Sequence, residues 1–268
     1  MQLAFARSLL FVPASNPRAM EKAQGLECDM VMLDLEDAVP DAQKGEARAA
    51  AVAARYPGKL TGIRINMEGT PWHGADMIAA KHSAADYVIL PKVETVRQVH
   101  DVRSVTEKPV IAMIESARGL IAAADIAAQP GTAALFMGVN DLRRDLGIAA
   151  DAGRSGLTLA LQGVVLAARA SGKAVFDGVY NRLEDAEGLE AECREGRAFG
   201  FDGKTLIHPN QIGITNALFG PDPQALAEAR RLIDAATGGA ERFEGSMIEA
   251  MHVDAARALI ARAEALGI

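Results

Sequence analysis

Two spacing patterns of hydrophobic residues alternate along the chain. Short aliphatic and β-branched runs predict strands, and between them lie Ala-rich stretches with apolar residues every three or four positions, the spacing of a helix face. The predicted strands cover residues 7–13, 30–36, 60–66, 87–93, 109–116, 133–139, 174–180 and 204–209. Strands that alternate with helices in this way predict an α/β fold, a (β/α)8 TIM barrel.

An open, doubly wound sheet is the alternative, because it shows the same alternation. However, the first strand is not followed by the Gly-x-Gly-x-x-Gly turn of dinucleotide-binding sheets. The length of 268 residues also suits one barrel, which typically takes about 250 residues. We therefore predict the barrel.

The pattern changes after residue 220. A turn and a helix are followed by a Gly-rich stretch, in which we interpret Gly238, Gly239 and Gly245 as hinges, and by a last helix over about residues 252–266. We expect a catalytic barrel and a C-terminal helical extension that acts as a lid. Their predicted ranges are residues 1–220 and 221–268.

Composition narrows the class of protein. Half of the residues are hydrophobic (50%), but no apolar run approaches the roughly 18 residues of a membrane span. A net charge of −7 disfavours general nucleic-acid binding, although a local basic pocket for an anionic ligand remains compatible with it. Cys28 and Cys193 are too few for a disulfide framework, and the first residues lack the basic region of a signal peptide. We expect a cytoplasmic protein.

Three acids stand at the end of the second predicted strand, in VMLDLEDAV at residues 31–39. Successive side chains of a strand point to opposite faces, so Asp34 and Glu36 share one face and the neighbouring leucines take the other. Buried charge is costly without a partner, so this end must meet cations, a metal or water. In a barrel, the active site lies at the carboxyl ends of the strands. Further polar residues at these ends are Asp37, Arg64, Asn66, Lys92, Glu115, Asn140, Asp141 and His208.

Two of these acids indicate a metal site. Glu115 and Asp141 follow adjacent strands, and two carboxylates with water and substrate oxygens suit magnesium. Zinc is disfavoured, because the chain has no Cys/His ligand spacing and only His208 at a strand end. The alternative for the two acids is a structural ion pair with Arg64 or Lys92.

Arg64 supplies a complementary group for an anionic substrate. A magnesium ion would chelate an α-keto or α-hydroxy carboxylate, and the guanidinium of Arg64 is suited to bind the same carboxylate with two parallel hydrogen bonds. A Lewis acid that polarises a carbonyl and stabilises an enolate suits the making or breaking of a carbon–carbon bond.

The first loop, FVPASNPRAMEKA, indicates a different kind of contact. Ser15 or Asn16 is expected to cap the helix that follows, and Arg18 and Lys22 stand four residues apart on one face near its start. Their charge suits phosphate, and Phe11 is suited to pack beside an adenine or a pantetheine arm. The alternative is a basic face that only meets solvent.

The chain resembles a known family in its motifs. The segments that carry the resemblance are RSLLFVPASNPRAMEKA, VMLDLEDAV, RIN, LPKVE, IES, GVNDLRRDLG and KTLIHPNQI. They are similar to the citrate lyase beta-subunit-like proteins of the HpcH/HpaI aldolase superfamily, which includes malyl-CoA and citramalyl-CoA lyases. The resemblance covers nearly the whole chain in order. It implies a magnesium-dependent barrel that binds a CoA thioester and cleaves or forms a C–C bond next to an α-keto acid.

The resemblance also implies roles for individual residues. Carried over by position, Glu115 and Asp141 bind magnesium, Arg64 binds the keto-acid carboxylate, and backbone N–H groups around Asn140 and Asp141 complete that site. The positions that match the lining of the CoA pocket are Phe11, Arg18, Lys22, Ile207 and His208.

The acids of the second strand gain a supporting role from the same pattern. Glu36 and Asp37 are expected to hold metal-bound water and to position Arg64. Lys92 is expected to neutralise the acidic cluster. A Schiff base at Lys92 is the alternative, which is disfavoured because carboxylates oppose the low pKa that it needs. Asp34, which lies deeper, is interpreted as a structural partner.

The segment that follows Gly245 resembles the C-terminal lid of malyl-CoA lyases, which carries an acid over the active site of a neighbouring subunit. Glu249 stands where the family usually has aspartate. The resemblance implies that Glu249 is a catalytic acid or base and that the protein is a homo-oligomer, a trimer. The alternatives are a different substrate, or a structural lid in which Glu249 is only an exposed acid at a helix start.

The predicted function is a magnesium-dependent CoA-ester lyase. Its products would be a short α-keto acid (glyoxylate, pyruvate or oxaloacetate) and an acyl-CoA. One alternative is an acyl-CoA thioesterase or a CoA-free keto-acid aldolase on the same barrel. Another is a citrate lyase beta subunit that works only in a complex, with an acyl-carrier partner.

Overall fold

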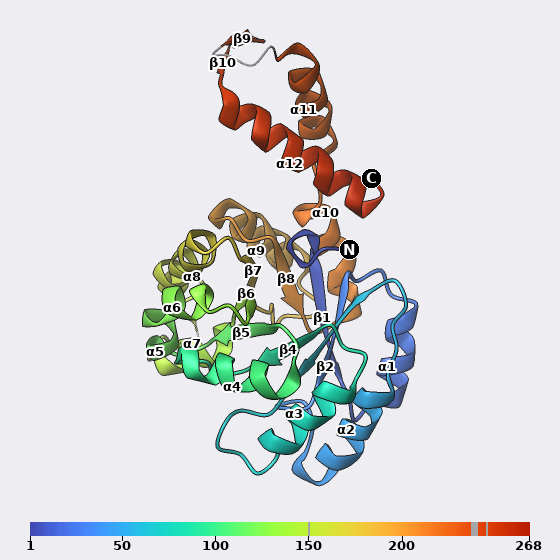
Figure 1. Cartoon of the computed structure of the whole chain (residues 1–268). Helices are drawn as coiled ribbons and strands as arrows, with labels where there is room; N and C mark the ends of the chain where they lie inside the picture. The colour runs from blue at the N-terminus through green and yellow to red at the C-terminus, as the bar shows by residue number, and fades with distance from the viewer. Residues whose placement is uncertain (150, 237–240, 245) are drawn as a thin grey trace.

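The computed structural model shows a closed barrel of parallel strands (Figure 1). It describes residues 1–149, 151–236, 241–244 and 246–268. The strands follow one another around the barrel in chain order, and the first also pairs with the eighth. The predicted (β/α)8 TIM barrel is confirmed.

The eight barrel strands all lie within or next to the predicted ranges. They are β1 (Ser8–Pro13), β2 (Met30–Asp34), β3 (Leu60–Arg64), β4 (Tyr87–Leu90), β5 (Val110–Ile114), β6 (Thr132–Met137), β7 (Ala174–Asp177) and β8 (Gly203–Leu206). The predictions run too far at the carboxyl ends. Residues 133–139 were expected to be one strand, but β6 ends at Met137, because Val139 already belongs to the next helix. Phe11 therefore lies within β1 and Arg64 is the last residue of β3, whereas Glu115 and Asp141 follow their strands.

Helices cover the outside of the barrel. They are α1 (Pro17–Gln24), α2 (Lys44–Ala53), α3 (His73–His82), α4 (Val96–Thr106), α5 (Ala117–Ile121), α6 (Ala123–Ala128), α7 (Val139–Asp145), α8 (Thr158–Ala170), α9 (Ala186–Phe199) and α10 (Ile212–Phe219). Short 3-10 helices are η1 (Leu3–Phe5), η2 (Asp41–Gln43), η3 (Ser155–Leu157) and η4 (Pro209–Gln211). Of the two candidates for the cap of α1, Asn16 is the one used, since its Oδ1 accepts from the N–H of Ala19.

Two apolar clusters hold the barrel together. One joins the outward side chains of the strands, such as Val31 and Leu33, to the inner faces of the helices. The other fills the barrel interior with side chains such as Met32 and Phe136, and Leu3 of η1 belongs to it at the amino-terminal end. The strands are therefore buried on both faces, as in other parallel sheets that helices cover.

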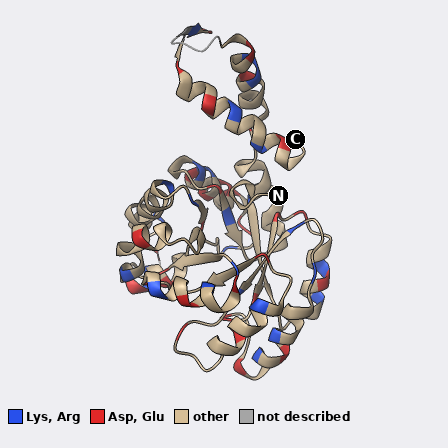
Figure 2. Cartoon of the chain, viewed as in Figure 1, with Lys and Arg blue, Asp and Glu red and all other residues tan. Residues whose placement is uncertain are grey.

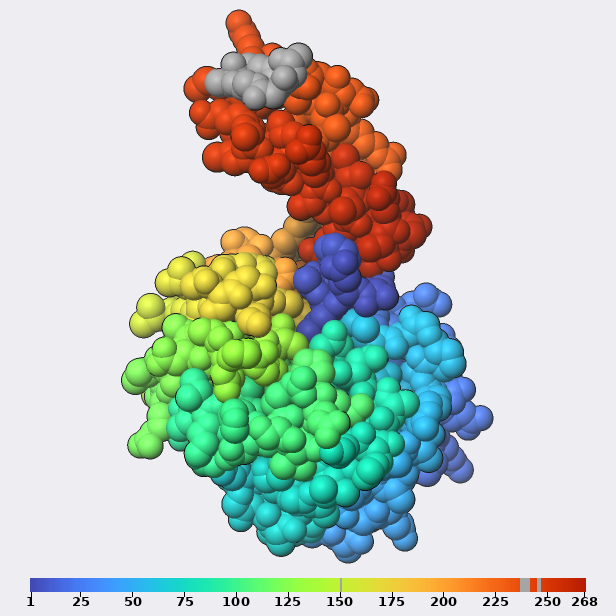
Figure 3. Space-filling model, viewed as in Figure 1, coloured from blue at the N-terminus to red at the C-terminus, as the bar shows by residue number. Residues whose placement is uncertain are grey.

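The C-terminal segment extends away from the barrel (Figures 1 and 3). Its elements are α11 (Pro223–Ala235), the hairpin of β9 (Glu241–Phe243) and β10 (Ser246–Ile248), and α12 (Ala250–Leu266), which packs along α11. We call this segment the arm. The predicted last helix is present and begins two residues earlier than expected, at Ala250. The predicted hinges Gly238, Gly239 and Gly245 lie outside the described residues.

The arm meets the barrel at the amino-terminal ends of the strands. Helix α12 lies against η1, which precedes β1. Arg262 of α12 donates a hydrogen bond through Nη2 to the backbone oxygen of Asp202, which precedes β8, across 2.7 Å. The attachment is thus at the opposite end from the carboxyl ends of the strands.

Charged residues of both signs are spread over the outer helices (Figure 2). Across the described ranges, no helix has the length and apolar character needed to cross a membrane.

Candidate active site

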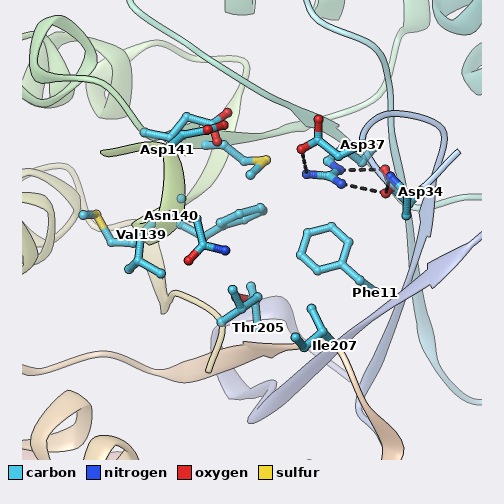
Figure 4. Close-up of a pocket in the computed structure, with 16 residues that line it drawn as sticks. Phe11, Asp34, Asp37, Val139, Asn140, Asp141, Thr205 and Ile207 are labelled. Carbon is cyan, nitrogen blue, oxygen red and sulfur yellow. Dashed lines mark hydrogen bonds and ion pairs between the residues drawn. The ribbon is translucent and has the colours of Figure 1, made fainter. Parts of the chain in front are cut away.

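A cavity of about 330 Å³ opens at the carboxyl ends of the strands (Figure 4). Its wall combines apolar side chains from β1, β5 and β6 with polar side chains at the last residues of β2 and β3 and just after β2, β5 and β6. Predicted site residues in its lining are Phe11, Asp37, Arg64, Glu115, Asn140, Asp141 and Ile207. The structure therefore brings together residues that lie far apart in the sequence.

Asp34 organises the turn after β2. Its carboxylate accepts four hydrogen bonds, two from the backbone N–H groups of Glu36 and Ala38 and two from Nε and Nη2 of Arg64. The side chain is 1% exposed. Burial alone would raise the pKa of Asp34, but the charge and hydrogen bonds of Arg64 outweigh burial and lower that pKa. Asp34 is thus the structural partner that its deeper position in the sequence predicted.

Arg64 has two different edges. Asp34 takes the Nε–Nη2 edge at 2.7 and 2.6 Å, so this pair of donors is not free for a substrate. Nη1 lies 3.2 Å from Oε2 of Glu36 and 3.4 Å from Oδ2 of Asp37. The ring of Phe11 covers the guanidinium, with 4.7 Å between Cζ and the ring centroid. The guanidinium is thus held in one orientation, with Nη1 between the buried carboxylate of Glu36 and the exposed carboxylate of Asp37.

Lys92 lies between the acids that follow β2 and β6. Its Nζ is 3.2 Å from Oε1 of Glu36 and 3.6 Å from Oδ2 of Asp141. Burial alone would lower the pKa of Lys92, but Glu36 and Glu115 outweigh it and raise that pKa. The amine is therefore protonated, which fits the predicted neutralising role and opposes a Schiff base.

Glu115 is fixed by its backbone neighbours. The N–H of Lys92 donates to Oε1 of Glu115 across 2.6 Å, and Lys92 adopts a left-handed backbone with φ of 51° to do so. On the other side, a Cβ added to Gly138 would lie 2.4 Å from the Cβ of Glu115, so only glycine allows this approach. Burial, together with the charge of Glu36, raises the pKa of Glu115 to about 8.

The donor set fits a divalent cation. The acids at this end of the barrel outnumber the cations that are buried with them. The acids are Asp34, Glu36, Asp37, Glu115 and Asp141, and the cations are the buried Arg64 and the half-buried Lys92. Oε2 of Glu36 is buried and accepts no hydrogen bond, although Nη1 of Arg64 lies 3.2 Å away as an ion pair. In the part of the chain that the structure describes, no three His, Cys, Asp or Glu side chains form a metal-binding group. Magnesium, however, commonly binds through one or two carboxylates and fills its other positions with water and substrate.

Residues 7–209 match the family described as HpcH/HpaI aldolase/citrate lyase. The chain belongs to this family. The resemblance noted in the sequence is therefore confirmed. The expectation that the protein is an enzyme, a lyase of the citrate lyase beta-like group, is confirmed with it.

Members of the family match over nearly the full chain. A (3S)-malyl-CoA thioesterase of Cereibacter sphaeroides is 42% identical and covers 97% of this chain and 95% of its own. The citrate lyase subunit beta-like protein of Mycobacterium tuberculosis is 36% identical over 95% of this chain and 94% of its own. A crystal structure of CitE from Mycobacterium tuberculosis, in complex with magnesium, acetoacetate and coenzyme A, superposes with a TM-score of 0.84 and 36% identity, over 98% of this chain and 100% of that one.

Some predicted residues lie away from the cavity wall. Arg18 and Lys22 are exposed on α1, the helix that follows the strand carrying Phe11. His208 accepts a hydrogen bond from the N–H of Asn210 at Nδ1 and so caps η4. Glu249 is the N-cap of α12, and its backbone N–H donates to Nδ1 of His252. It does not line the cavity of its own chain.

Other residues of the wall were not predicted. They are Ala38, Met113, Phe136, Met137, Gly138, Val139, Val179 and Thr205. Strand alternation would have found Met113, because it lies two residues before Glu115 and so shares its face. Asn181 exchanges two hydrogen bonds with Asn140 across 2.7 and 3.3 Å, and no sequence pattern links these two amides.

Proposed function

We propose that this family member is a magnesium-dependent lyase that cleaves, or in reverse forms, a C–C bond in a malyl-, citramalyl- or citryl-CoA type ester. The observation that carries the proposal is the cavity in which the carboxylates of Glu115 and Asp141 share one wall with Arg64 and Phe11. A metal site, an anion-binding cation and an apolar surface are the three features that such a substrate requires. The magnesium and coenzyme A bound to the related CitE structure support the assignment.

We assign the polar residues as follows. Glu115 and Asp141 hold magnesium, which when bound polarises the substrate oxygen and stabilises enolate charge. Arg64 binds the keto-acid carboxylate through Nη1, because Asp34 occupies its other edge. Glu36 and Asp37 flank Nη1 and hold water beside the metal site. Backbone N–H groups around Asn140 and Asp141 complete the carboxylate site.

The proposed cleavage conserves atoms and charge. A base removes the proton of the substrate hydroxyl, the C–O bond becomes a carbonyl, and the adjacent C–C bond breaks. Its electron pair passes to the acyl-CoA as an enolate, which then takes up a proton. The products are an α-keto acid and an acyl-CoA. We assign the proton transfer to Glu249.

The CoA arm is assigned to the β1 side of the cavity. Phe11 and Ile207 line the cavity there, and Arg18 and Lys22 stand on the helix that follows β1. The exposed cations of α1 suit the phosphates of CoA, and the apolar wall suits its pantetheine arm. His208, which follows Ile207, completes the proposed CoA contact.

The position of the arm supports a site completed by a second subunit. The arm is attached at the amino-terminal end of its own barrel, and the cavity lies at the opposite end. Glu249 therefore serves a neighbouring copy in this proposal, in a homotrimer. Residues 1–220 form the catalytic barrel and 221–268 the lid. We further propose that the enzyme works in the cytoplasm, with an acyl-carrier partner only if it acts within a citrate lyase complex.

A thioesterase is the second candidate, because the 42% identical relative is a (3S)-malyl-CoA thioesterase. In that reaction, water adds to the thioester carbonyl, the C–S bond breaks, and the CoA thiolate leaves and takes up a proton. The cavity that holds the acyl group would be the same.

A substrate panel tests these proposals. The purified protein is assayed with magnesium and malyl-, citramalyl- and citryl-CoA, and free CoA, acyl-CoA and keto acid are measured separately. Equal amounts of keto acid and acyl-CoA support the lyase. Free CoA without keto acid indicates the thioesterase. Inactivity that is restored by carrier and transferase subunits indicates a subunit of a complex, and permanent inactivity contradicts the proposal.

A further inference from the structure

Lys44 of α2 is a buried cation outside the cavity wall. It is 4% exposed. Its Nζ donates to the backbone oxygens of Leu35 and Glu36, each across 2.9 Å, and to Oδ1 of Asn66 across 2.7 Å. The ring of Trp72 covers the same ammonium at 4.9 Å. Among the residues described, it forms no ion pair with a carboxylate, so backbone and amide dipoles and the Trp72 ring take the place of water around this charge.

The turn after β2 is therefore held by opposite charges on its two sides. From inside the barrel, the carboxylate of Asp34 accepts the N–H groups of Glu36 and Ala38. From the helix layer, the ammonium of Lys44 donates hydrogen bonds to the backbone oxygens of Leu35 and Glu36. The β2 strand ends at Asp34, so these groups lie beyond the strand. Two neutral donors share the oxygens with Lys44, since Nδ2 of Asn66 donates to the oxygen of Leu35 and the N–H of Val39 donates to that of Glu36. Lys44 differs from them because it is charged and contacts both oxygens.

This turn carries the acids that surround Arg64. Glu36 contacts Nη1 of Arg64 at 3.2 Å and Nζ of Lys92 at 3.2 Å, and Asp37 contacts Nη1 at 3.4 Å. A shift of the Glu36 peptide moves both acids relative to Arg64 and Lys92. Displacements of about 1 Å in such a site can lower the rate on the order of 100-fold.

We propose that Lys44 is a positioning residue for the active site. By holding the carbonyls of Leu35 and Glu36, it fixes the carboxylates of Glu36 and Asp37, and these in turn position Arg64. The expected effect of Lys44 on turnover rests on the function proposed above. The expected effect of Lys44 on the structure of the turn does not depend on that function.

Arg48 offers a matched control on the same helix, one turn after Lys44. Its Nε donates to Oδ1 of the fully buried Asp76 across 2.7 Å. Asp76 in turn accepts the backbone and side-chain N–H groups of Asn66. Arg48 thus ties α2 to α3 and has no direct hydrogen bond to the turn after β2, which it reaches only through Asp76 and Asn66. A purely structural role of Lys44 predicts that both residues have the same effect.

The test compares Lys44→Met with Arg48→Met. We expect Lys44→Met to lower kcat about 100-fold while the KM for the CoA ester stays within about twofold, because the CoA arm binds elsewhere. Calorimetry with magnesium and pyruvate should show weaker pyruvate binding. Amide hydrogen exchange of a peptide spanning residues 35–38 should be faster. Arg48→Met should lower thermal stability comparably, with kcat within about threefold of the parent and slow exchange in that peptide.

Lys44→Gln keeps N–H donors without the charge and serves if Lys44→Met does not fold. We expect its kcat between those of the parent and Lys44→Met. Parent-like exchange at residues 35–38 in a folded Lys44 variant, or a kcat equal to that of Arg48→Met, overturns the proposal. If the parent enzyme cleaves none of the CoA esters, the function assigned above fails, and hydrogen exchange still decides the role of Lys44.

Discussion

Asp34 binds one whole edge of the Arg64 guanidinium, with Oδ1 2.7 Å from Nε and Oδ2 2.6 Å from Nη2. Both side chains are buried. The two parallel hydrogen bonds leave Nη1 as the donor that turns toward Glu36 and Asp37. The sequence suggested that both donors of one edge bind a substrate carboxylate. In the structure, the Nε–Nη2 edge binds Asp34 instead, and this pairing orients Nη1.

The first prediction concerns this orientation. Arg64→Lys keeps the charge but cannot satisfy both Asp34 and a substrate, because an ammonium lacks the planar fork. We expect the KM for the keto acid in the condensation direction to rise about 10-fold or more, with little change in the KM for acyl-CoA. Steady-state kinetics in the condensation direction measure both constants. An unchanged keto-acid KM would assign the carboxylate to another residue.

The second prediction concerns the metal. Glu115→Ala and Asp141→Ala should each abolish metal-dependent turnover and leave the barrel folded, because both side chains line the cavity and neither belongs to the apolar core. Magnesium titration by calorimetry should show lost or strongly weakened binding. Glu94→Ala, which removes a nearby acid outside the cavity wall, is the control. Parent-like magnesium affinity in both variants would exclude the two carboxylates as ligands.

The third prediction follows from the raised pKa of Glu115, which moves from an ordinary 4.5 to about 8. Between these pH values the folded, metal-free protein keeps a proton that the unfolded chain releases. The free energy of unfolding therefore falls as pH rises through this range, by up to about 1.4 kcal/mol per pH unit from this group. Glu115→Gln cannot ionise and should remove that contribution.

Urea unfolding in EDTA at several pH values between 5 and 9 measures this difference. The gap in stability between Glu115→Gln and the parent should widen in favour of the variant as the pH rises. Magnesium should stabilise the parent more at higher pH, because a carboxylate must lose its proton to bind metal. A gap that stays constant with pH would contradict the raised pKa.

The fourth prediction concerns CoA. Removing Arg18 and Lys22 together should weaken CoA binding about 10-fold and reduce its dependence on salt, because exposed cations hold phosphates mainly by charge. Pyruvate binding should not change. The control removes two exposed cations from other helices, Arg103 and Arg194. If CoA binds equally to both double variants, the α1 cations only meet solvent.

The fifth prediction concerns Glu249. Glu249→Gln and Asp141→Ala should each be inactive alone. Mixed under conditions in which subunits exchange, they should regain part of the parent activity, since some sites then combine an intact barrel with an intact arm. Light scattering should report a trimer in both cases. A fully active Glu249→Gln protein would end the proposed role of this residue.

The sequence by itself determined the barrel and most of the polar side chains of the cavity wall. Strand and helix periodicities are local properties of the chain, and a barrel places every strand's carboxyl end at one rim. Residues as distant as Phe11, Arg64, Glu115 and Asp141 were therefore predictable as neighbours, and they line one cavity.

Only the tertiary structure decided which polar groups pair. The choice between Asp34 and a substrate for the edge of Arg64 depends on side-chain direction and on distances of a few tenths of an ångström, which no periodicity encodes. The same holds for Lys44, which looks like an ordinary surface residue at the start of a helix but is buried against the Leu35 and Glu36 carbonyls. Burial forces such groups to find partners, and only the packed fold determines which partners are within reach.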